Sequence, residues 1–469
     1  MDNRTIAAIS TPLGPGGIGI IRISGPQAFG ILKKLFVFKG KKSAQKNDSD
    51  RSFSSHRVYY GYLHEAHSDT VIDEVLVFFM KAPNSYTRED VVEIQSHSGY
   101  IVLERIMGAI LDAGADLARP GEFTQRAFLN GRIDLTQAEA VIDLINAPCE
   151  IAAKNAVKQA SGGIKDKIET LLHLVNELYG KCEAVIEFAE SDNLSIADNL
   201  LEIRQGIFDT LLVQVRHLIQ AQKSSAIFFD GVLMTIAGVP NVGKSSLLNQ
   251  LVEKETAIVS EMPGTTRDVI REYLSIKGIP ITLCDTAGLH ETQDPVECIG
   301  IDKARDHIDK AELLLFVVEA NRELNDFENQ FITDNADKRI LVVVNKVDIA
   351  VPAALEKINK HIDGFISAAV SAKTGLGITD LKELIFNGLV KDQTQRQLPT
   401  ATPNLRQRKI LERIEQMIFS DIENTRTQPD PELMADLLGR IRKELEEITG
   451  STNGEDLYDF IFSQFCVGK

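Results

Sequence analysis

The sequence has few cysteines and no long apolar run. Its five cysteines, in 469 residues, are scattered and form no C-x-x-C pair, which argues against a disulfide framework and against a zinc site. No stretch approaches the ~18 consecutive apolar residues of a membrane-spanning helix, and the N-terminus lacks the basic and apolar regions of a signal peptide. We therefore expect a cytoplasmic protein whose cysteines are free thiols.

Basic residues are in the minority. The chain has 51 lysines and arginines against 67 acidic residues, and its formal net charge of -16 argues against a broad basic surface that binds nucleic acid by neutralising phosphates alone. This balance leaves room for a local basic patch or for a partner that binds nucleic acid. With 43% hydrophobic and 25% charged residues the composition is that of an ordinary soluble protein, and the length predicts about three domains.

The most informative stretch is residues 238–245, which fits the pattern G-x-x-x-x-G-K-S/T. In this pattern successive backbone N–H groups surround a β-phosphate, Lys244 reaches the β- and γ-phosphate oxygens, and the hydroxyl of Ser245 binds Mg²⁺. An apolar strand is predicted over residues 232–237 and helical spacing over 246–255, so the phosphates would lie at a helix N-terminus. The stretch predicts a phosphate-binding loop.

Three further motifs follow in the order typical of guanine-nucleotide-binding domains. Residues 285–288 (DTAG), after the apolar run 279–284, place a carboxylate near Mg²⁺ and a glycine N–H near the γ-phosphate. Asp348, in the segment NKVD after the apolar run 340–344, can accept hydrogen bonds from guanine donors that adenine does not present. Residues 371–373 (SAK) would close over the base. We therefore predict a GTP-binding domain.

The residue that positions the attacking water is less evident. Leu289 follows Gly288 where small GTPases commonly have a glutamine, and a leucine side chain cannot orient water. Glu297 is a candidate base or water orienter; the alternative is a solvated glutamate at a helix start. Asn241 could bind a monovalent cation that neutralises charge between the β- and γ-phosphates, or it could be a simple turn residue.

The segment 260–268 is the expected switch region. A threonine here normally completes the Mg²⁺ shell and senses the γ-phosphate. Thr266 is the first choice for this role, with Thr265 next.

The remaining sequence predicts an α/β plus α fold. Residues 1–120 are expected to form a small N-terminal α/β domain, with strands over 5–10, 19–24 and 71–80 and a helix over 101–113. Helical stripes before and after the nucleotide-binding unit predict a Ras-like P-loop GTPase domain inserted into a helical domain. The expected limits are 121–225 for the first helical part, 226–390 for the GTPase domain and 391–469 for the second helical part.

Along its whole length the chain resembles the MnmE (TrmE) family of GTPases, which modify the wobble uridine of certain tRNAs. The resemblance rests on five stretches: residues 19–25 (GIIRISG), 119–131 (RPGEFTQRAFLNG), 264–268 (GTTRD), 285–289 (DTAGL) and 465–469 (FCVGK). Related GTPases of ribosome assembly share the central motifs but not the first 130 residues or the tail.

The resemblance implies a K⁺-stimulated GTPase that acts with an FAD- and NADH-dependent, MnmG-like subunit. Together they would add an aminomethyl or carboxymethylaminomethyl group to C5 of the uridine at tRNA position 34. The one-carbon unit would come from 5-formyltetrahydrofolate or a related tetrahydrofolate held by the N-terminal domain. The resemblance also implies a homodimer whose GTP-binding domains meet across K⁺, and a heterotetramer with the partner subunit.

The resemblance assigns the sites residue by residue. The folate contacts fall on Arg22, Glu93, Arg132 and Lys469, the Mg²⁺ ligands on Ser245 and Thr266, the K⁺ ligands on Asn241, Ser260, Met262 and Thr265, and the catalytic glutamate on Glu297. Motifs and resemblance together give a GTP-binding set of Asn241, Val242, Gly243, Lys244, Ser245, Ser246, Ser260, Thr265, Thr266, Asp285, Thr286, Ala287, Gly288, Asn345, Lys346, Asp348, Ser371, Ala372 and Lys373. Arg132 stands where the family has a lysine, which keeps the charge and changes the donor geometry. Ser260 stands where a threonine is commoner.

Two other interpretations of the sequence assign a different function to the protein. A ribosome-assembly or signalling switch would use GTP only to regulate binding, and many such proteins carry an added basic RNA-binding domain that is not evident here. A third interpretation makes the N-terminal half an independent folate enzyme that turns over a formyl donor without GTP. Lys469 is either a ligand that enters the folate pocket or part of a frayed terminus.

Overall fold

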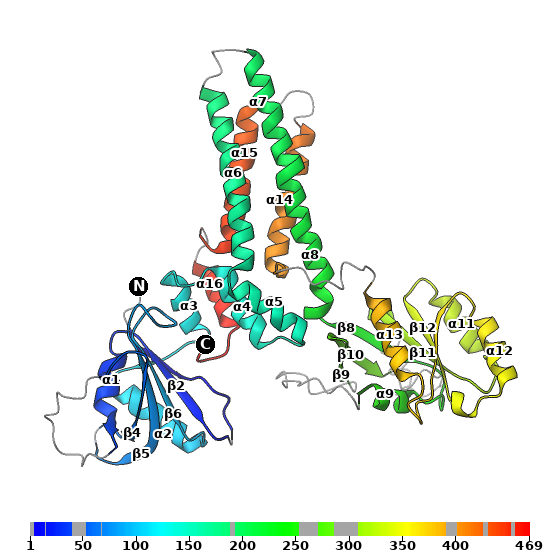
Figure 1. Ribbon diagram of the computed structural model, residues 1–469, viewed down its shortest axis with the longest axis horizontal. Helices are drawn as coiled ribbons and strands as arrows, with labels where there is room; N and C mark the ends of the chain where they lie inside the picture. Colours follow the sequence, from blue (N-terminus) through cyan, green and yellow to red (C-terminus); the bar gives the residue numbers. More distant parts are fainter. Residues whose placement is uncertain are drawn as a thin grey trace, which may run out of the picture. The chain divides into compact units, whose positions relative to one another are not determined.

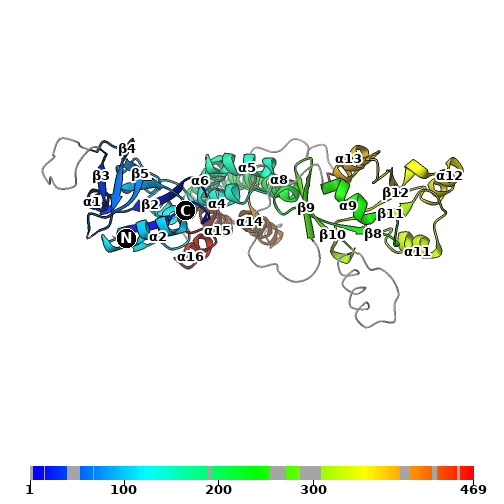
Figure 2. The ribbon, with the colours of Figure 1, turned by 90° about the horizontal axis from the view of Figure 1, so that it is seen from below.

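The computed structural model describes residues 4–14, 16–39, 53–66, 68–187, 193–252, 271–285, 308–390, 401–424, 430–451 and 455–469. The chain divides into two compact units (Figure 1). The first comprises Met1–Ile142, Gln159–Leu211 and Met417–Lys469, and the second comprises Asp143–Lys158 and Leu212–Gln416. Each unit contains one sheet, and the elements of both can be followed in Figures 1 and 2.

The sheet of the first unit has seven strands in the order β3-β4-β5-β6-β2-β1-β7. All neighbours are antiparallel except β1 and β7, which are parallel. The strands are β1 (Ile6–Ile9), β2 (Gly19–Ser24), β3 (Phe36–Phe38), β4 (Arg57–His64), β5 (Val71–Met80), β6 (Val91–Ser96) and β7 (Asp116–Leu117), and two helices accompany them, α1 (Ala28–Leu35) and α2 (Tyr100–Asp112).

The two faces of this sheet differ because side chains alternate along each strand. On one face, apolar residues of the strands pack with the buried residues of α1 and α2, such as Leu32 and Ile106. The register places Arg22 beside Glu93, Glu93 beside Phe78 and Phe78 beside Val58, so these four residues form a row on the other face. This second face carries two of the predicted folate residues.

The helices of the first unit follow the apolar stripes in the sequence. They are α3 (Glu122–Leu129), α4 (Leu135–Ile145), α6 (Gly163–Glu187), α7 (Asn193–Gln205), a π-helix (Gly206–Leu212), α15 (Pro431–Thr449) and α16 (Glu455–Ser463). Helix α6 packs along α15 with Leu171 and Val175 buried on one side and Leu438 and Ile441 on the other. A smaller core joins α4 to α16 and the residues that follow it.

The sheet of the second unit has six strands in the order β13-β12-β11-β8-β10-β9. The strands are β8 (Val232–Ala237), β9 (Arg271–Ile276), β10 (Ile279–Asp285), β11 (Leu313–Glu319), β12 (Ile340–Asn345) and β13 (Ile366–Ala369). All are parallel neighbours except β9 and β10. The carboxyl ends of parallel strands meet at one edge, where ligands of open α/β sheets bind.

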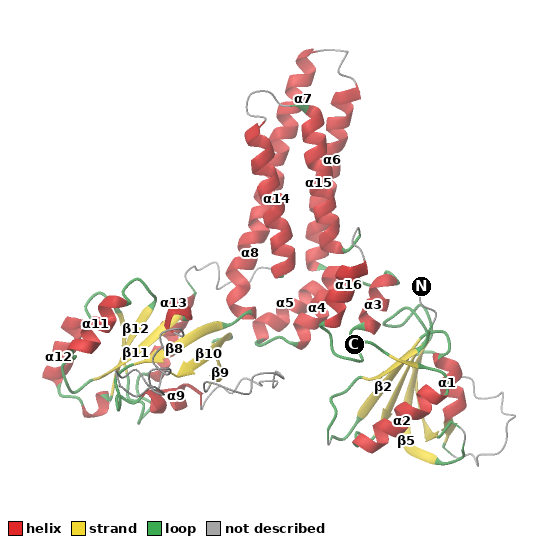
Figure 3. Ribbon diagram, turned by 180° about the vertical axis from the view of Figure 1, so that it is seen from behind, coloured by secondary structure: helices red, strands yellow, loops and turns green. Residues whose placement is uncertain are grey.

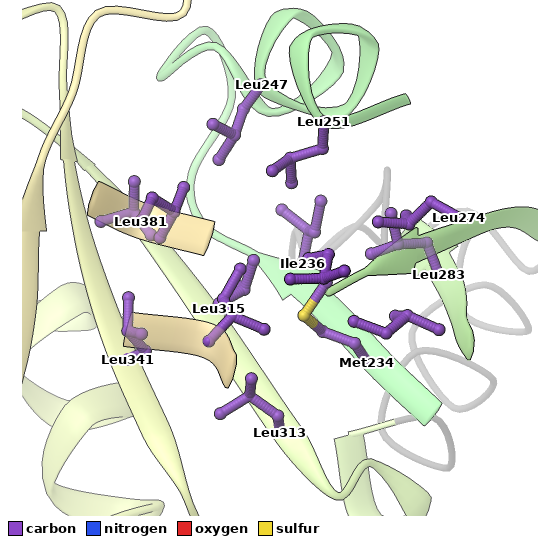
Figure 4. Close-up of a cluster of buried hydrophobic side chains, with 14 of the residues drawn as sticks. Met234, Ile236, Leu247, Leu251, Leu274, Leu283, Leu313, Leu315, Leu341 and Leu381 are labelled. Atoms are coloured by element: carbon purple, nitrogen blue, oxygen red, sulfur yellow. The ribbon is translucent and has the colours of Figure 1, made fainter. Parts of the chain in front are cut away.

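Helices cover both faces of this parallel sheet, as buried strands require. They are α9 (Lys244–Val252), α11 (Asp326–Asp334), α12 (Pro352–His361) and α13 (Ile378–Leu389), with a 3₁₀ turn at Val347–Ile349. Figure 4 shows one core, in which Leu247 and Leu251 of α9 and Leu381 of α13 lie with Ile236 and Leu315 of the sheet. On the other face Phe316 packs with residues of α11 and α12.

Three further helices belong wholly or mainly to the second unit: α5 (Glu150–Ala160), α8 (Val213–Phe229) and α14 (Leu405–Asn424). Buried polar contacts join them where the chain enters and leaves the GTPase domain. The backbone N–H of Thr402 donates to Asn155 Oδ1 at 2.9 Å, and the hydroxyls of Thr402 and Ser225 lie 3.1 Å apart. The side chain of Arg216 on α8 also pairs with Glu415 on α14 at 2.7 Å.

The predicted fold class is confirmed: an N-terminal α/β domain, a helical domain, and a P-loop GTPase-like sheet whose residues lie between the two helical segments (Figure 3). The predicted domain limits stay predictions. Within the residues that the structure describes, no helix combines the length and apolarity needed to cross a membrane.

Candidate functional site

The phosphate-binding loop joins β8 to α9, and two of its glycines have backbone angles that favour glycine. Gly238 has φ +150° and Gly243 has φ +98°. A Cβ on Gly238 would lie 2.4 Å from the carbonyl oxygen of Val317, and one on Gly243 would lie 2.4 Å from Asn345 Nδ2. Both distances are far below contact distance, so the loop passes close to the ends of β11 and β12 only because these residues lack side chains.

The functional side chains of this loop lie at the start of α9. Lys244 Nζ donates to the carbonyl oxygens of Gly238 at 2.8 Å and Val239 at 3.1 Å, which places the ammonium over the loop. Ser245 and Ser246, in the first turn of the helix, are exposed. A loop of N–H groups at a helix N-terminus, with a lysine over it, suits a phosphate.

Asn241 also lies in this loop. It is exposed and has φ +62°, a left-handed conformation that asparagine adopts more readily than most residues. The side-chain amide oxygen is therefore accessible to a ligand.

Asn345 joins three of the predicted motifs. Its side-chain Nδ2 donates to the carbonyl oxygen of Val242 at 2.8 Å, and its Oδ1 accepts from the backbone N–H of Ala372 at 2.9 Å. Asn345 is 1% exposed, so both bonds are shielded from water. This one side chain brings the phosphate-binding loop, the NKVD segment and the SAK segment to the same edge of the sheet.

The expected base-binding residues surround this junction. Asp348 lies in the 3₁₀ turn after β12 and is exposed, so its carboxylate is accessible to a base. Lys346 has φ +64°, and its Nζ lies 2.9 Å from Glu319 Oε1. In the third motif Ser371 is buried and its hydroxyl accepts from the N–H of Thr374 at 3.2 Å, whereas Lys373 is exposed.

Several predicted residues lie outside what the structure describes. They are Ser260, Met262, Thr265, Thr266, Thr286, Ala287, Gly288 and Glu297. The backbone of Asp285 ends β10 and pairs with Ile236 of β8, which brings this position to the carboxyl edge of the sheet. The assignments of these residues to Mg²⁺, K⁺, GTP and catalysis stay predictions.

In the first unit the predicted folate residues Arg22 and Glu93 form an ion pair. Arg22 Nε donates to Glu93 Oε1 at 2.8 Å, and both side chains are 22% exposed. The same guanidinium donates to the carbonyl oxygen of Gly468 at 3.3 Å, and the hydroxyl of Ser10 donates to that oxygen at 3.2 Å. The end of the chain, including Lys469, thus lies beside Arg22.

The tail is packed closely against β1. Gly468 has φ +92°, and a Cβ there would lie 2.6 Å from the carbonyl oxygen of Ile9. The backbone N–H of Gly121 donates to the carbonyl oxygen of Cys466 at 3.5 Å. These contacts seat the last residues on the N-terminal domain.

Tyr86 links Arg22 to Arg132, the fourth predicted folate residue. The guanidinium carbon of Arg132 lies 4.7 Å from the centre of the Tyr86 ring, and that of Arg22 lies 5.9 Å from the same centre. The Tyr86 hydroxyl lies 3.0 Å from the hydroxyl of the buried Thr124. Tyr86 is not predictable from the sequence, because it belongs to none of the motifs and no spacing connects it to the arginines.

An open pocket of about 520 Å³ lies beside Tyr86 and Arg132. It is lined by His56, Met80, Pro83, Asn84, Ser85, Tyr86, Arg88 and Arg132. The guanidinium groups of Arg88 and Arg132 at this pocket make a local positive site on an acidic chain, and such a site suits carboxylates.

A buried ion-pair network holds helix α3, which carries the residues that contact Arg22 and Tyr86. Arg126 of α3 is 8% exposed and donates to Glu122 at 3.0 Å and to both oxygens of Glu89 at 3.2 Å. Because Phe123 and Thr124 lie on the same short helix, this network fixes the residues that contact Arg22 and Tyr86.

The parallel sheet, its phosphate-binding loop and the guanine-type segment joined through Asn345 define a P-loop GTPase domain. Residues 5–132 match the family described as GTP-binding protein TrmE N-terminus, and residues 135–466 match the MnmE helical domain. The chain belongs to the MnmE family of tRNA modification GTPases.

Individual relatives match over the full length. The tRNA modification GTPase MnmE of Desulforamulus reducens is 41% identical over 470 residues, which cover 99% of each chain. Those of Acetivibrio thermocellus and Carboxydothermus hydrogenoformans are each 39% identical over 469 residues, again with 99% of each chain covered.

Proposed function

We propose that this protein is a K⁺-stimulated GTPase that modifies tRNA with an FAD-dependent, MnmG-like partner. The pair adds an aminomethyl or carboxymethylaminomethyl group to C5 of the uridine at position 34, with a one-carbon unit from a tetrahydrofolate. The observation that carries the proposal is that one chain contains two sites: the nucleotide site joined by the Asn345–Val242 hydrogen bond, and the site around the Arg22–Glu93 ion pair. The chain also belongs to a family of tRNA modification GTPases. A cytoplasmic location follows from a tRNA substrate.

In the GTPase site, each residue of the proposed set has one task. Backbone N–H groups of the loop and Lys244 bind the phosphates, Ser245 and Thr266 hold Mg²⁺, and Asp348 accepts from guanine. The exposed position of Ser245 in the first turn of α9 fits a metal ligand next to bound phosphates. Mg²⁺ would supply charge neutralisation at the phosphate oxygens.

K⁺ is proposed to bind Asn241, Ser260, Met262 and Thr265. The exposed, left-handed Asn241 fits this role because its amide oxygen can face the bound phosphates. K⁺ would neutralise charge that develops between the β- and γ-phosphates, and Glu297 would orient or deprotonate the attacking water.

The residues of the first unit fit a folate. The guanidinium groups of Arg22 and Arg132 suit the glutamyl carboxylates. The Glu93 carboxylate can accept from pterin N–H groups, and the Tyr86 ring offers an apolar face. Lys469 follows Gly468, whose carbonyl oxygen accepts from Arg22, and is proposed as a further folate contact. The bound folate would supply the one-carbon unit, and these residues would bind and orient it.

We further propose that the protein is a homodimer and that the second copy docks on the open face of the N-terminal sheet. The apolar side chains of Val58, Tyr60 and Leu76 are 52%, 44% and 40% exposed, and the register places all three on the same face as Arg22. Exposed apolar patches of this kind mark protein interfaces. Given the net charge of -16, much of the charge that binds tRNA would belong to the partner subunit.

The first test is the steady-state GTPase rate in KCl and in NaCl at equal ionic strength, with the intact protein, Asn241→Ala and Glu297→Ala. We expect K⁺ stimulation that is lost in Asn241→Ala, and a large drop in kcat with retained nucleotide binding in Glu297→Ala. The exposed residues Asn249 and Glu356 provide matched alanine controls that should retain K⁺ stimulation. Equal rates in both salts would contradict the cation-assisted mechanism and favour a slow GTP switch.

The second test is reconstitution of tRNA modification with the partner subunit, followed by mass analysis of the nucleosides. The modified uridine should require GTP, K⁺ and the folate together. Modification that proceeds at full rate without GTP would contradict the coupling of the two sites.

A further inference from the structure

Glu319 lies next to the NKVD segment (residues 345–348) because of the register of the sheet. It is the last residue of β11 and pairs with Asn345, the last residue of β12. The backbone N–H of Ala320 donates to the carbonyl oxygen of Asn345 at 2.8 Å, so the two strand ends are held together beyond the last pair. The position of Glu319 is therefore fixed by backbone hydrogen bonds.

The carboxylate of Glu319 contacts two cations. Its Oε1 lies 2.9 Å from Lys346 Nζ, and its Oε2 lies 3.7 Å from Arg322 Nε. The side chains of Glu319 and Lys346 are 20% and 30% exposed, so water screens this pair less than a surface pair.

The side chain of Arg322 is also held by a second carboxylate, that of Glu328. Its two terminal nitrogens donate to the two oxygens of Glu328, each at 2.7 Å, in a bidentate pair. Glu328 is completely buried and forms a capping box with Asn325 at the start of α11. The four charged residues Glu319, Arg322, Glu328 and Lys346, which we call the Glu319 cluster, thus balance two negative against two positive charges.

The backbone of Lys346 is strained. Its φ of +64° lies in the left-handed region, which a lysine rarely adopts and which persists where the surroundings determine the conformation. Asn345 on one side is fixed by its two buried hydrogen bonds, and the Lys346 side chain is held by Glu319.

We propose that Glu319 is a positioning residue for nucleotide binding, which acts by holding the side chain of Lys346 in place at the guanine base. The inference rests on the proposed assignment of Lys346 to the base. A lysine has a flexible four-carbon stem that loses rotamer freedom when a ligand orders it. A lysine that Glu319 already holds loses less of that freedom, so the nucleotide binds more tightly.

The test is the dissociation rate of a fluorescent GDP from the full-length protein, at constant Mg²⁺ and salt. Glu319→Gln keeps the shape of the side chain and removes its charge, and we expect dissociation about threefold to tenfold faster. Glu319→Asp keeps the charge one methylene further away and should give a smaller increase. Glu323→Gln is the matched control and should leave the rate unchanged, because Glu323 lies in the loop after β11 and pairs with the exposed Lys357 of α12.

A double-mutant cycle separates positioning from a general effect on the fold. In a Lys346→Ala background, Glu319→Gln should have no further effect on GDP dissociation, because its target is gone. An equal effect in both backgrounds would overturn the inference, as would a Glu319→Gln rate equal to wild type. If Lys346→Ala alone leaves dissociation unchanged, the assignment of Lys346 to the base fails instead. In the nucleotide-free proteins Glu319→Gln should lower the thermal midpoint about as much as Lys346→Ala, because each removes one charge of the same pair. A much larger drop confined to Glu319→Gln and Glu319→Asp would overturn the positioning role.

Discussion

Asn345 Nδ2 donates a hydrogen bond to the carbonyl oxygen of Val242, 2.8 Å away, across 103 residues of sequence. The bond ties the phosphate-binding loop to the NKVD segment, which is proposed to recognise the base. Since Asn345 Oδ1 also accepts from the N–H of Ala372, one amide sets the geometry of the whole nucleotide site.

Asn345→Ala should weaken nucleotide binding and destabilise the GTPase domain. The substitution leaves a buried carbonyl and a buried N–H without their partner, and each such loss costs about 1–3 kcal/mol. Denaturant unfolding and GDP dissociation measure the two effects. The exposed Asn359→Ala on α12 is the control, and an Asn345→Ala protein that binds GDP like this control would contradict the role of the junction.

Gly238→Ala should abolish GTP binding, because its Cβ would lie 2.4 Å from the carbonyl oxygen of Val317, a backbone atom that cannot move aside alone. Gly388→Ala is the matched control. Gly388 lies in α13 with nothing within 4 Å of the added carbon, so alanine should stabilise the helix by up to about 1 kcal/mol and retain GTP binding. Equilibrium binding of GTP and thermal unfolding distinguish the two variants. Normal binding by Gly238→Ala would show that the loop is not held as closely as the contact indicates.

Tyr86→Phe and Tyr86→Ala should affect folate binding differently. Phenylalanine keeps the ring that both Arg22 and Arg132 contact and loses only the contact with the Thr124 hydroxyl, so tetrahydrofolate affinity should fall a few-fold at most. Alanine removes the ring and should weaken binding by about tenfold or more. Calorimetric titration with 5-formyltetrahydrofolate measures both.

Arg132→Lys tests a position where the family resemblance predicts a lysine. The Arg132→Lys protein should still bind 5-formyltetrahydrofolate, because lysine keeps the positive charge, whereas the Arg132→Ala protein should bind the folate weakly. Equal affinities for wild type and Arg132→Ala would remove Arg132 from the site.

Cys182 should make stability fall as the solution becomes alkaline. The thiol is completely buried on α6, and this burial raises the pKa of Cys182 from 9.0 to about 11. Between pH 9 and 11 the unfolded chain loses this proton while the folded chain retains it, so unfolding is favoured increasingly as the pH rises through that window.

Urea unfolding at pH 8, 9 and 10 checks this prediction. Cys182→Ala should be less stable at pH 8 because of the space it leaves, but its stability should fall less steeply with pH. Cys466→Ala, at an exposed position, should retain the wild-type pH dependence. Identical pH slopes for wild type and Cys182→Ala would contradict the raised pKa.

Local patterns in the sequence predicted local structure well. The strands over 19–24, 71–80 and 232–237 have the predicted bounds, because a continuous or alternating apolar pattern ends at the same residues as the strand. The predicted helix over 246–255 begins two residues earlier, at Lys244, since the phosphate-binding loop leads directly into its first turn. Strands β3, β4, β6, β7, β9, β11 and β13 were not predicted individually. Strands β3, β7 and β13 are only three, two and four residues long and depend on their neighbours in the sheet, whereas the apolar run of β11 (LLLFVVE) could have predicted that strand.

The sequence by itself determined the strand, glycine-rich loop and helix around residues 238–245 and the division into sheet and helical regions. Each depends on residues close together in the chain, whose spacing is set by the geometry of a strand, a turn or a helix. The tertiary structure alone decided that Tyr86 contacts both Arg22 and Arg132 and that Glu319 contacts Lys346. It also decided that Gly468 meets Arg22, across 446 residues. These contacts follow from strand register and from the packing of distant segments, to which each residue contributes only a small part of the free energy, so no local pattern encodes them.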